Sequence, residues 1–198
     1  MSDAFHADQT CALLGADDQR RLLELARRCL EARVRRQPQP SIEYHGALDV
    51  RRGAFVSIHG NDDLRGCLGR LETDRAVADV VAHLATVVAD SDPRFPPVTP
   101  EELPTLVIEI SVLTPEREVA DVKEIEVGRH GVIVEQGSRR GLLLPQVATE
   151  YGWDRETFLD YTCVKAGLPR DAWRQGARVF RFEAQVFHEN AHDVTHES

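Results

Sequence analysis

The sequence predicts an α+β fold with a largely antiparallel sheet flanked by helices. Segments with the two-residue period of strands come in adjacent pairs around short turns, which is typical of antiparallel hairpins. Segments with apolar residues at helical spacing stand between these pairs, and no segment repeats another. Strands and helices mixed in this way are typical of the α+β class.

The first half of the chain is predicted to hold two helices with a hairpin between them. An aspartate precedes each helical pattern and is expected to cap it. Prolines at 38–40 end the first helix, because proline breaks the hydrogen-bond ladder. In chain order, the expected elements are a helix from Asp17 or Asp18 to about Arg36, strands at 54–58 and 64–71 around a turn at 59–63, and a helix from Asp74 to about Val88.

The second half begins with a loop that we expect to be stiff. Four of the nine residues at 92–100 are proline, which forbids regular structure and restricts the backbone. We expect its DPRFPP part, 92–97, to be ordered and to lie near residues 64–69, as one wall of a cleft. The later elements expected are a strand at 106–113, a hairpin of 127–135 and 141–144 around 137–140, short helices near 145–150, 154–166 and 170–175, and a last strand at 178–187.

Composition and charge exclude several classes of protein. The 198 residues suffice to bury a core without a disulfide or a metal. The sequence has no run of eighteen apolar residues and no signal-peptide pattern at its start, so we expect a soluble cytoplasmic protein without membrane contact. The net charge of −9 would repel a phosphate backbone, which disfavours nucleic acid as a partner. The four cysteines form no CxxC pair, and we expect no metal site.

The sequence LRGCLG at 64–69 is the first candidate site, because it places Cys67 between Gly66 and Gly69 in a predicted strand. Glycine weakens a strand interior unless a bulge or a close approach needs the space, so these glycines would leave room for a substrate or partner beside the thiol. In a regular strand Arg65 would point to the same face as Cys67, about 6 to 7 Å away along the backbone, where its charge would favour the thiolate. The alternative is a small buried cysteine in a glycine bulge.

A nucleophilic thiol needs a base and a group that orients the base. His130 is the candidate base, since it lies among glycines at a strand start where a histidine has no evident packing role. Glu109 is the candidate third member, because a carboxylate within an apolar strand is costly unless it is paired or faces a cleft. The alternatives are a turn histidine bonded to the backbone and a glutamate at a rim position paired with an arginine.

Three polar residues are second-rank candidates for binding. Asp92 and Arg94 belong to the DPRFPP loop, and Gln146 follows a proline in the segment GLLLPQVA. The alternatives are a salt bridge within the loop and a cap at the start of a helix.

The segment HENAH at 188–192 matches the HExxH pattern of zinc peptidases, in which a helix presents both histidines to the metal. The context differs here. The preceding residues alternate like a strand, and only six residues follow His192. We therefore do not assign a metal site to this segment.

Eight motifs in fixed order resemble the AMMECR-domain family, also called AmmeMemoRadiSam system protein A. They are LRGCLG, DPRFPP, EISVL, GRHGVIV, GLLLPQVA, the segment from Trp153 to Leu159, CVKAGL and the closing strand, and they span roughly residues 20 to 190. Leu68 stands where many relatives carry isoleucine. The resemblance implies one domain of two lobes over 16–189, with the signature residues near a cleft between the lobes. Residues 1–15 are expected to be disordered or loosely packed, and 190–198 to form a polar tail.

The resemblance also implies partners, because family members are often encoded with, or fused to, a Memo-like protein and a radical-SAM protein. We expect a cysteine-dependent enzyme that acts on a small molecule or a modified residue together with such partners. The alternative is a non-catalytic binding or scaffold module that uses the same cleft. The sequence identifies no cofactor. An enzyme would need Cys67 exposed, whereas a scaffold would tolerate serine at this position.

Overall fold

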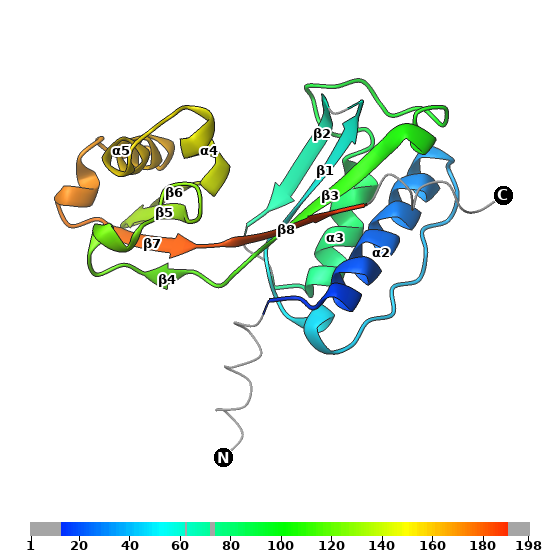
Figure 1. Cartoon of the computed structure of the whole chain (residues 1–198), viewed down its shortest axis with the longest axis horizontal. Coiled ribbons are helices and arrows are strands. Elements are labelled where there is room, and N and C mark those ends of the chain that lie inside the picture. The colour runs from blue at the N-terminus through cyan, green and yellow to red at the C-terminus, as the bar shows by residue number, and fades with distance from the viewer. Residues whose placement is uncertain (1–12, 62, 72–73, 190–198) are drawn as a thin grey trace, which may run out of the picture. The chain divides into compact units, whose positions relative to one another are not determined.

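A computed structural model describes residues 13–61, 63–71 and 74–189 (Figure 1). The chain divides into two compact units. The first unit contains the described residues up to Leu113 and those from Gln185 onward, and the second contains Thr114–Ala184. Each unit has its own antiparallel strand pairs, helices and hydrophobic core. The structure therefore confirms the predicted α+β class, with two sheets in place of one.

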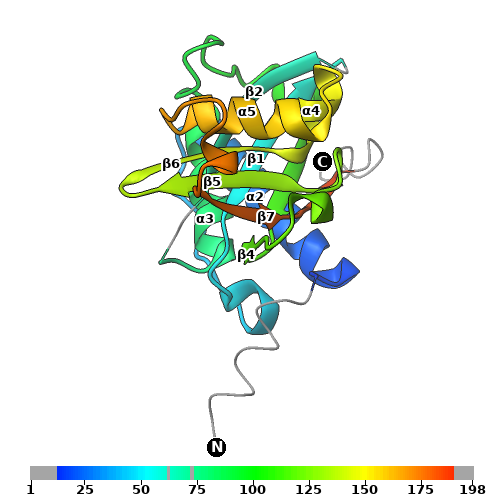
Figure 2. The ribbon, with the colours of Figure 1, turned by 90° about the vertical axis from the view of Figure 1, so that its left-hand side faces the viewer.

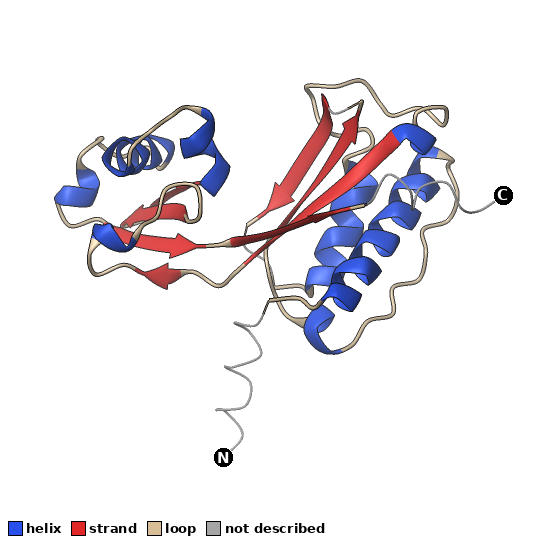
Figure 3. Ribbon diagram, in the orientation of Figure 1, coloured by secondary structure: helices blue, strands red, loops and turns tan. Residues whose placement is uncertain are grey.

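The first unit is a four-stranded sheet with two helices packed on one face (Figure 3). The strands lie in the order β2-β1-β3-β8, and β1 pairs antiparallel with both β2 and β3. The elements are helices α2 (Ala16–Val34) and α3 (Val77–Val87), the short 3₁₀ helices η1 (Gly46–Asp49) and η2 (Leu103–Thr105), and strands β1 (Ala54–Gly60), β2 (Asp63–Arg70), β3 (Leu106–Leu113) and β8 (Ala184–His188).

One face of this sheet forms the core of the unit. Val56, Ile58 and Ile108 point toward the helices and are fully buried. Helix α3 is apolar on most of its surface, since it packs both on the sheet and on α2. Because successive side chains of a strand point to opposite faces, Ser57 and Glu109 lie on the face away from these helices.

The second unit has its own four-stranded sheet, in the order β4-β7-β5-β6 (Figure 2). Helix α5 packs on β5 and β6, and its buried residues Phe158, Leu159 and Cys163 share a core with Val132 and Val134. The elements are strands β4 (Arg117–Glu118), β5 (Gly131–Gln136), β6 (Arg139–Leu143) and β7 (Arg178–Phe182), helices α4 (Pro145–Glu150) and α5 (Arg155–Lys165), and 3₁₀ helices η3 (Val122–Glu124) and η4 (Ala172–Arg174).

Both early helices begin without the predicted aspartate caps. Helix α2 starts before Asp17 and Asp18, which stand in its first turn, where negative charge suits the helix dipole. Helix α3 starts at Val77 rather than after Asp74, and no side chain caps it. The Val77 N–H donates to the Val50 carbonyl at 2.9 Å, so a tertiary contact takes the place of the cap. None of the helices in the described part of the chain is long and apolar enough to cross a membrane.

The last predicted strand, 178–187, is two strands in two different sheets. β7 pairs in the sheet of the second unit, and β8 lies beside β3 in the first. Between them, Glu183 and Thr114 exchange hydrogen bonds: each backbone N–H donates at 2.8 Å, to the Thr114 hydroxyl and to the Glu183 carbonyl respectively. The strand-like alternation of the sequence continues through Glu183, so the sequence does not reveal that the chain passes from one sheet to the other there.

Leu14, which was expected to be loosely packed, belongs to the core of the first unit. Leu14 is buried, its N–H donates to Gln185 Oε1 at 2.8 Å, and its carbonyl accepts from Gln185 Nε2 at 2.9 Å. The rest of the predicted loose segment, Cys11 included, and the predicted tail at 190–198 lie outside the described residues.

Candidate functional site

Strand β2 is irregular at Arg65. The register with β1 shifts between Ile58 and His59, so that Ile58 pairs with Gly66, His59 pairs with Leu64, and Arg65 is the extra residue of a bulge. The expected placement of Arg65 on the face of Cys67 relied on a regular strand, and the bulge breaks that alternation.

The Arg65 side chain forms hydrogen bonds to the proline-rich loop and to the residues that follow it. Its Nε donates to Glu102 Oε1 at 2.7 Å, and its terminal nitrogens donate to the carbonyls of Pro96 and Pro97 at 2.9 and 3.3 Å. Glu102 also accepts from the Thr99 backbone at 2.7 Å, and the hydrogen bond from Arg65 lowers the pKa of Glu102. Arg65 therefore holds the 92–102 segment against β2.

The spaces beside the two glycines of the motif are filled. A Cβ atom at Gly69 would lie 2.1 Å from the ring of Phe55, its cross-strand partner. A Cβ atom at Gly66 would lie 3.2 Å from side-chain atoms of Ile58 and Val88, on the face that packs against α3. Within this unit, close packing explains both glycines.

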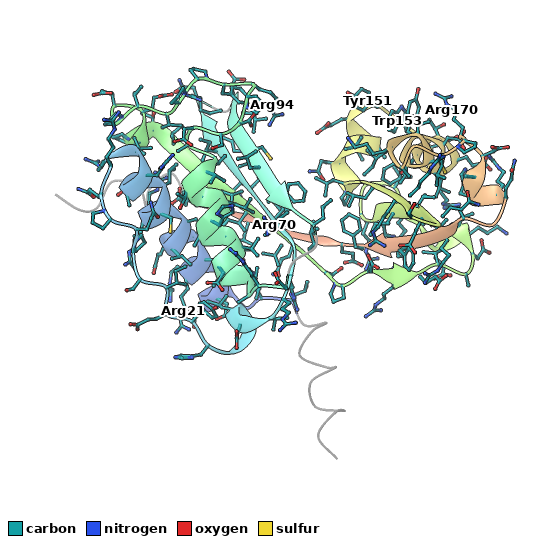
Figure 4. The ribbon with its side chains drawn as sticks, turned by 180° about the vertical axis from the view of Figure 1, so that it is seen from behind. Arg21, Arg70, Arg94, Tyr151, Trp153 and Arg170 are labelled. Carbon is teal, nitrogen blue, oxygen red and sulfur yellow. The ribbon has the colours of Figure 1, made fainter. Side chains whose placement is uncertain are left out.

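The DPRFPP loop closes the outer edge of β2 at Cys67. As an edge strand, β2 has backbone groups without a strand partner. The Cys67 N–H donates to Asp92 Oδ2 at 2.9 Å, and Arg94 Nη2 donates to the Cys67 carbonyl at 3.2 Å. Asp92 and Arg94 thus bind the two groups that a neighbouring strand would bind, and the loop lies beside the motif as predicted (Figure 4).

The side chains of Asp92 and Arg94 also form a salt bridge with each other. Arg94 Nε donates to Asp92 Oδ1 at 2.9 Å and its Nη2 to Oδ2 at 2.7 Å. The Asp92 side chain is only 3% exposed, so its charge needs these donors. The hydrogen bonds from Arg94 and from the Cys67 backbone hold the pKa of Asp92 well below its usual range.

Three polar side chains form a row across the sheet, on the face away from the helices. Ser57 of β1 pairs with Cys67 of β2 on one side and with Glu109 of β3 on the other. The Ser57 hydroxyl lies 3.1 Å from the Cys67 sulfur and can donate to it. Directly opposite residues have Cβ atoms about 5 Å apart, so Glu109 is within side-chain reach of Ser57. Two predicted site residues, Cys67 and Glu109, are thus brought to one face with a serine between them.

Strand β8 extends this row to His188. The Thr114 N–H donates to the Glu183 carbonyl, and the Glu189 N–H donates to the Ile108 carbonyl at 3.0 Å. These two bonds define an antiparallel alignment of β3 and β8 in which His188 lies opposite Glu109. His188 is exposed, as expected on the face away from the core.

Glu189, the glutamate of the HENAH segment, connects the end of β8 with β3 and with α2. Its Oε2 accepts from the Ile108 N–H at 2.9 Å, and Arg27 of α2 forms a largely buried ion pair with the carboxylate. His188 lies in a strand, where its side chain and that of Glu189 point to opposite faces. His192 is outside the described residues, among which no group of three or more metal-ligating side chains is suited to hold a metal ion.

His130 lies in the second unit, in the turn before β5. The Glu126 backbone amide donates to its Nδ1 at 2.9 Å, and its Nε2 lies 3.4 Å from Glu183 Oε1. Arg181 lies 2.8 Å from Nε2. Burial, followed by the charge of Arg181, lowers the pKa of His130. This is the backbone-bonded turn histidine of the alternative interpretation, and the role of base to Cys67 stays a prediction.

Gln146 also lies in the second unit. It is exposed in the first turn of α4, and its backbone carbonyl accepts from the Thr149 hydroxyl at 2.7 Å. Its predicted binding role remains untested.

The described cysteines differ in exposure. Cys29 and Cys163 are at most 2% exposed, and burial raises the pKa of both thiols. Cys67 is partly exposed. Of the cysteines that the structure describes, Cys67 is therefore the one most open to a reagent.

Sequence reasoning missed Ser57, Glu102 and His188. Ser57 is a polar residue in an otherwise apolar strand and could have been noticed. Its contact with Cys67, however, depends on a hairpin register that the bulge shifts. The place of His188 depends on the path of β8 into the first sheet, for which the sequence carries no local signal.

Comparisons with known proteins agree with the resemblance that the motifs carry. The family model AMMECR1 matches residues 23–187. A protein of Methanothermobacter thermautotrophicus is 45% identical over 188 residues, which cover 90% of this chain and 98% of that protein. Protein MJ0810 of Methanocaldococcus jannaschii is 46% identical over 155 residues, 74% of this chain and 77% of its own length.

A solved structure shows the same fold. It is the crystal structure of uncharacterized protein PH0010 from Pyrococcus horikoshii, which aligns with a TM-score of 0.72 and 40% identity over 85% of this chain and 90% of that one. With the family model spanning most of the sequence and relatives of this identity, the chain belongs to the AMMECR1 family.

Proposed function

We propose that the chain is a cysteine-dependent enzyme in which Cys67 reacts with a small molecule or a modified residue. The observation that carries this proposal is the contact of Cys67 with Ser57, 3.1 Å between sulfur and oxygen, in a row that continues to Glu109. A partly exposed thiol beside a hydroxyl, with a carboxylate opposite that hydroxyl on the next strand, has the groups that nucleophilic catalysis needs.

The row offers a path for the thiol proton. A thiol attacks as the thiolate, so its proton must leave before or during bond formation. For this step the Ser57 hydroxyl, which donates to the Cys67 sulfur in the structure, rotates so that it accepts the thiol proton and donates its own toward Glu109. The Cys67 sulfur then forms a bond to an electrophilic carbon of the substrate, and the leaving group departs with the proton that the carboxylate received. His188, opposite Glu109, extends the row to solvent.

The DPRFPP loop fixes the position of the reacting group. Asp92 and Arg94 bind both backbone groups of Cys67 on the edge side, and Ser57 is its partner on the other. A cysteine whose backbone is held on one side and whose sulfur contacts Ser57 on the other loses little freedom when a substrate binds. In this proposal His130 keeps its structural role in the second unit, and Glu109 receives the proton.

The family resemblance supports Memo-like and radical-SAM proteins as partners. The alternative function is a non-catalytic module that binds such a partner through the same face. An apolar residue on that face favours it, because Val186 of β8 is 55% exposed. In that case Cys67 would serve packing and serine would replace it without loss.

The test is covalent trapping followed by intact-mass measurement. The native protein is incubated with a small-molecule extract and with a panel of activated acyl and alkyl compounds. We expect an adduct on Cys67 that disappears in Cys67→Ser, forms more slowly in Ser57→Ala and is unchanged in the control Cys29→Ser. If no adduct forms while Cys67→Ser still binds a co-expressed Memo-like protein, the enzymatic proposal is wrong and the scaffold alternative stands.

A further inference from the structure

The second unit carries a stack of three aromatic rings with one open end. The rings of Tyr151 and Trp153 lie 4.9 Å apart at 18°, and those of Trp153 and Tyr161 lie 4.2 Å apart at 3°. Figure 4 shows Tyr151 and Trp153 together beside α5. Tyr151 is the outermost ring, 68% exposed, and no other described ring stacks on its outer face. An open aromatic face at the end of a stack can take a further planar group or a cation.

The chain builds this stack with a tight turn at the end of α4. Gly152 has a φ of +63°, a conformation that glycine adopts without strain. The turn lets the Trp153 N–H donate to the Ala148 carbonyl at 2.8 Å and brings residues 151 and 153 onto the same side. Trp153 packs partly against the core of the unit, so the stack is anchored while Tyr151 stands outside it.

The other end of the same stack is closed by an arginine. The Arg170 guanidinium lies 4.6 Å from the centre of the Tyr161 ring. The same pairing recurs elsewhere in the unit, where Arg174 lies 3.9 Å from the Trp173 ring centre. Phe180 has arginines at 4.7 and 5.7 Å from its ring centre. The rings of this unit therefore take a guanidinium on a free face, and the outer face of Tyr151 lacks one.

A carboxylate follows Tyr151 closely along the chain, because Asp154 stands three residues after it. A depression of about 500 Å³ adjoins Trp153 and is lined by Val127, Asp154, Arg155 and Glu156 as well. Hydrogen bonding by the Thr157 side chain, followed by that of its backbone N–H, lowers the pKa of the Asp154 carboxyl, so this exposed group is charged. The Arg155 guanidinium is held at the Ile125 carbonyl, 2.8 Å from Nε, and Glu156 is paired with Arg174. Asp154 is thus the lining residue whose charge is not met by an arginine in these contacts.

We propose that the outer face of Tyr151 is a binding site for an arginine side chain of a partner protein. The guanidinium would stack on the Tyr151 ring as the next layer, and the Asp154 carboxylate would meet its charge. A planar cation fits both features, because an aromatic face attracts positive charge and a flat group can lie parallel to the ring. The site is independent of the reaction at Cys67.

The experiment uses the full chain labelled with ¹⁵N, and the indole signal of Trp153 as the reporter. The chain has two tryptophans, and Trp173 serves as the internal control because its Nε1 donates to Asp160 at 2.8 Å. The probes are blocked tripeptides with a central arginine, lysine or citrulline, and adenosine. We expect saturable movement of the Trp153 signal with the arginine peptide, with an affinity at least about threefold above that for lysine or citrulline.

Two variants test the residues. Tyr151→Ala should weaken arginine binding about fivefold or more, whereas Tyr151→Phe keeps the ring and should bind within about twofold of the parent. Tyr151 is largely exposed, so neither change disturbs the core. Equal binding of citrulline, equal binding of lysine, tighter binding of adenosine, or no saturable shift would each overturn the assignment to arginine.

Discussion

The carboxylate of Asp92 accepts a hydrogen bond from the backbone amide of Cys67 at 2.9 Å, and this contact joins the proline-rich loop to the strand that carries the thiol. Arg94 completes the contact through the carbonyl of the same residue. The aspartate and arginine of DPRFPP and the cysteine of LRGCLG therefore meet at one peptide unit, although 25 positions separate Asp92 from Cys67.

Removal of the Asp92 carboxylate should destabilise the first unit. Asp92→Ala leaves the Cys67 amide and the Arg94 charge without their partner, a loss we expect to cost on the order of 3 kcal/mol in the free energy of unfolding. The control is Asp90→Ala, because Asp90 is paired with the exposed Arg33 and should cost less than about 1 kcal/mol. Urea unfolding measures both, and equal costs would contradict the role of Asp92.

The contribution of Asp92 should depend on pH in one direction. Its pKa is lowered in the folded protein by Arg94, while in the unfolded chain it is about 4. Its stabilisation is therefore fully present above about pH 4 and is lost as the pH falls from there through the lower folded value. The difference in unfolding free energy between the parent and Asp92→Asn should be constant from about pH 5 to 7 and shrink below about pH 4. A difference that grows in acid would refute this explanation.

Gly69 should tolerate a side chain only if Phe55 is removed. A Cβ atom at this position would lie 2.1 Å from the Phe55 ring, so Gly69→Ala should cost about 1 to 3 kcal/mol through overpacking. In the Phe55→Ala background the same change should cost less than about 0.5 kcal/mol. A double-mutant cycle measured by urea unfolding gives the coupling, and additive costs would show that the glycine serves another purpose.

The substitution His130→Ala distinguishes a structural role of His130 in its turn from a role as the base for Cys67. The change removes the buried His130 ring and leaves the Glu126 amide without its acceptor, which should cost about 1 to 3 kcal/mol in stability. The alkylation rate of Cys67 in the folded protein should stay within about twofold of the parent, because our proposal gives the proton to Glu109. A fall in that rate as large as in Ser57→Ala would restore His130 as the base that the sequence predicted.

Strong local patterns in the sequence were sufficient for most of the fold. The strand predicted at 106–113 is β3 with the same bounds, because its alternation is strict. The hairpin at 54–71 and the two long helices are also confirmed, except at their ends. Helix starts were missed where a tertiary contact replaced a side-chain cap, and the switch from β7 to β8 was missed because both strands alternate in the same way.

The candidate site was predictable in its residues and less so in their arrangement. Cys67, Asp92 and Arg94 were singled out by unusual neighbours, and the structure joins them directly. The direction of Arg65 could not be foreseen, because one extra residue in a bulge redirects the side chain. Ser57 was not foreseen either, since its pairing with Cys67 is a matter of strand register.

The most direct test of the proposed function is the rate at which iodoacetamide labels each cysteine of the folded protein, read by peptide mass spectrometry in a Cys11→Ser background. We predict that Cys67 is labelled first, that Cys29 and Cys163 are labelled only on unfolding, and that Ser57→Ala and Glu109→Gln each slow the labelling of Cys67 by about fivefold or more. Labelling of Cys67 that requires unfolding, or a rate unchanged by both substitutions, would contradict a reactive thiol at this site.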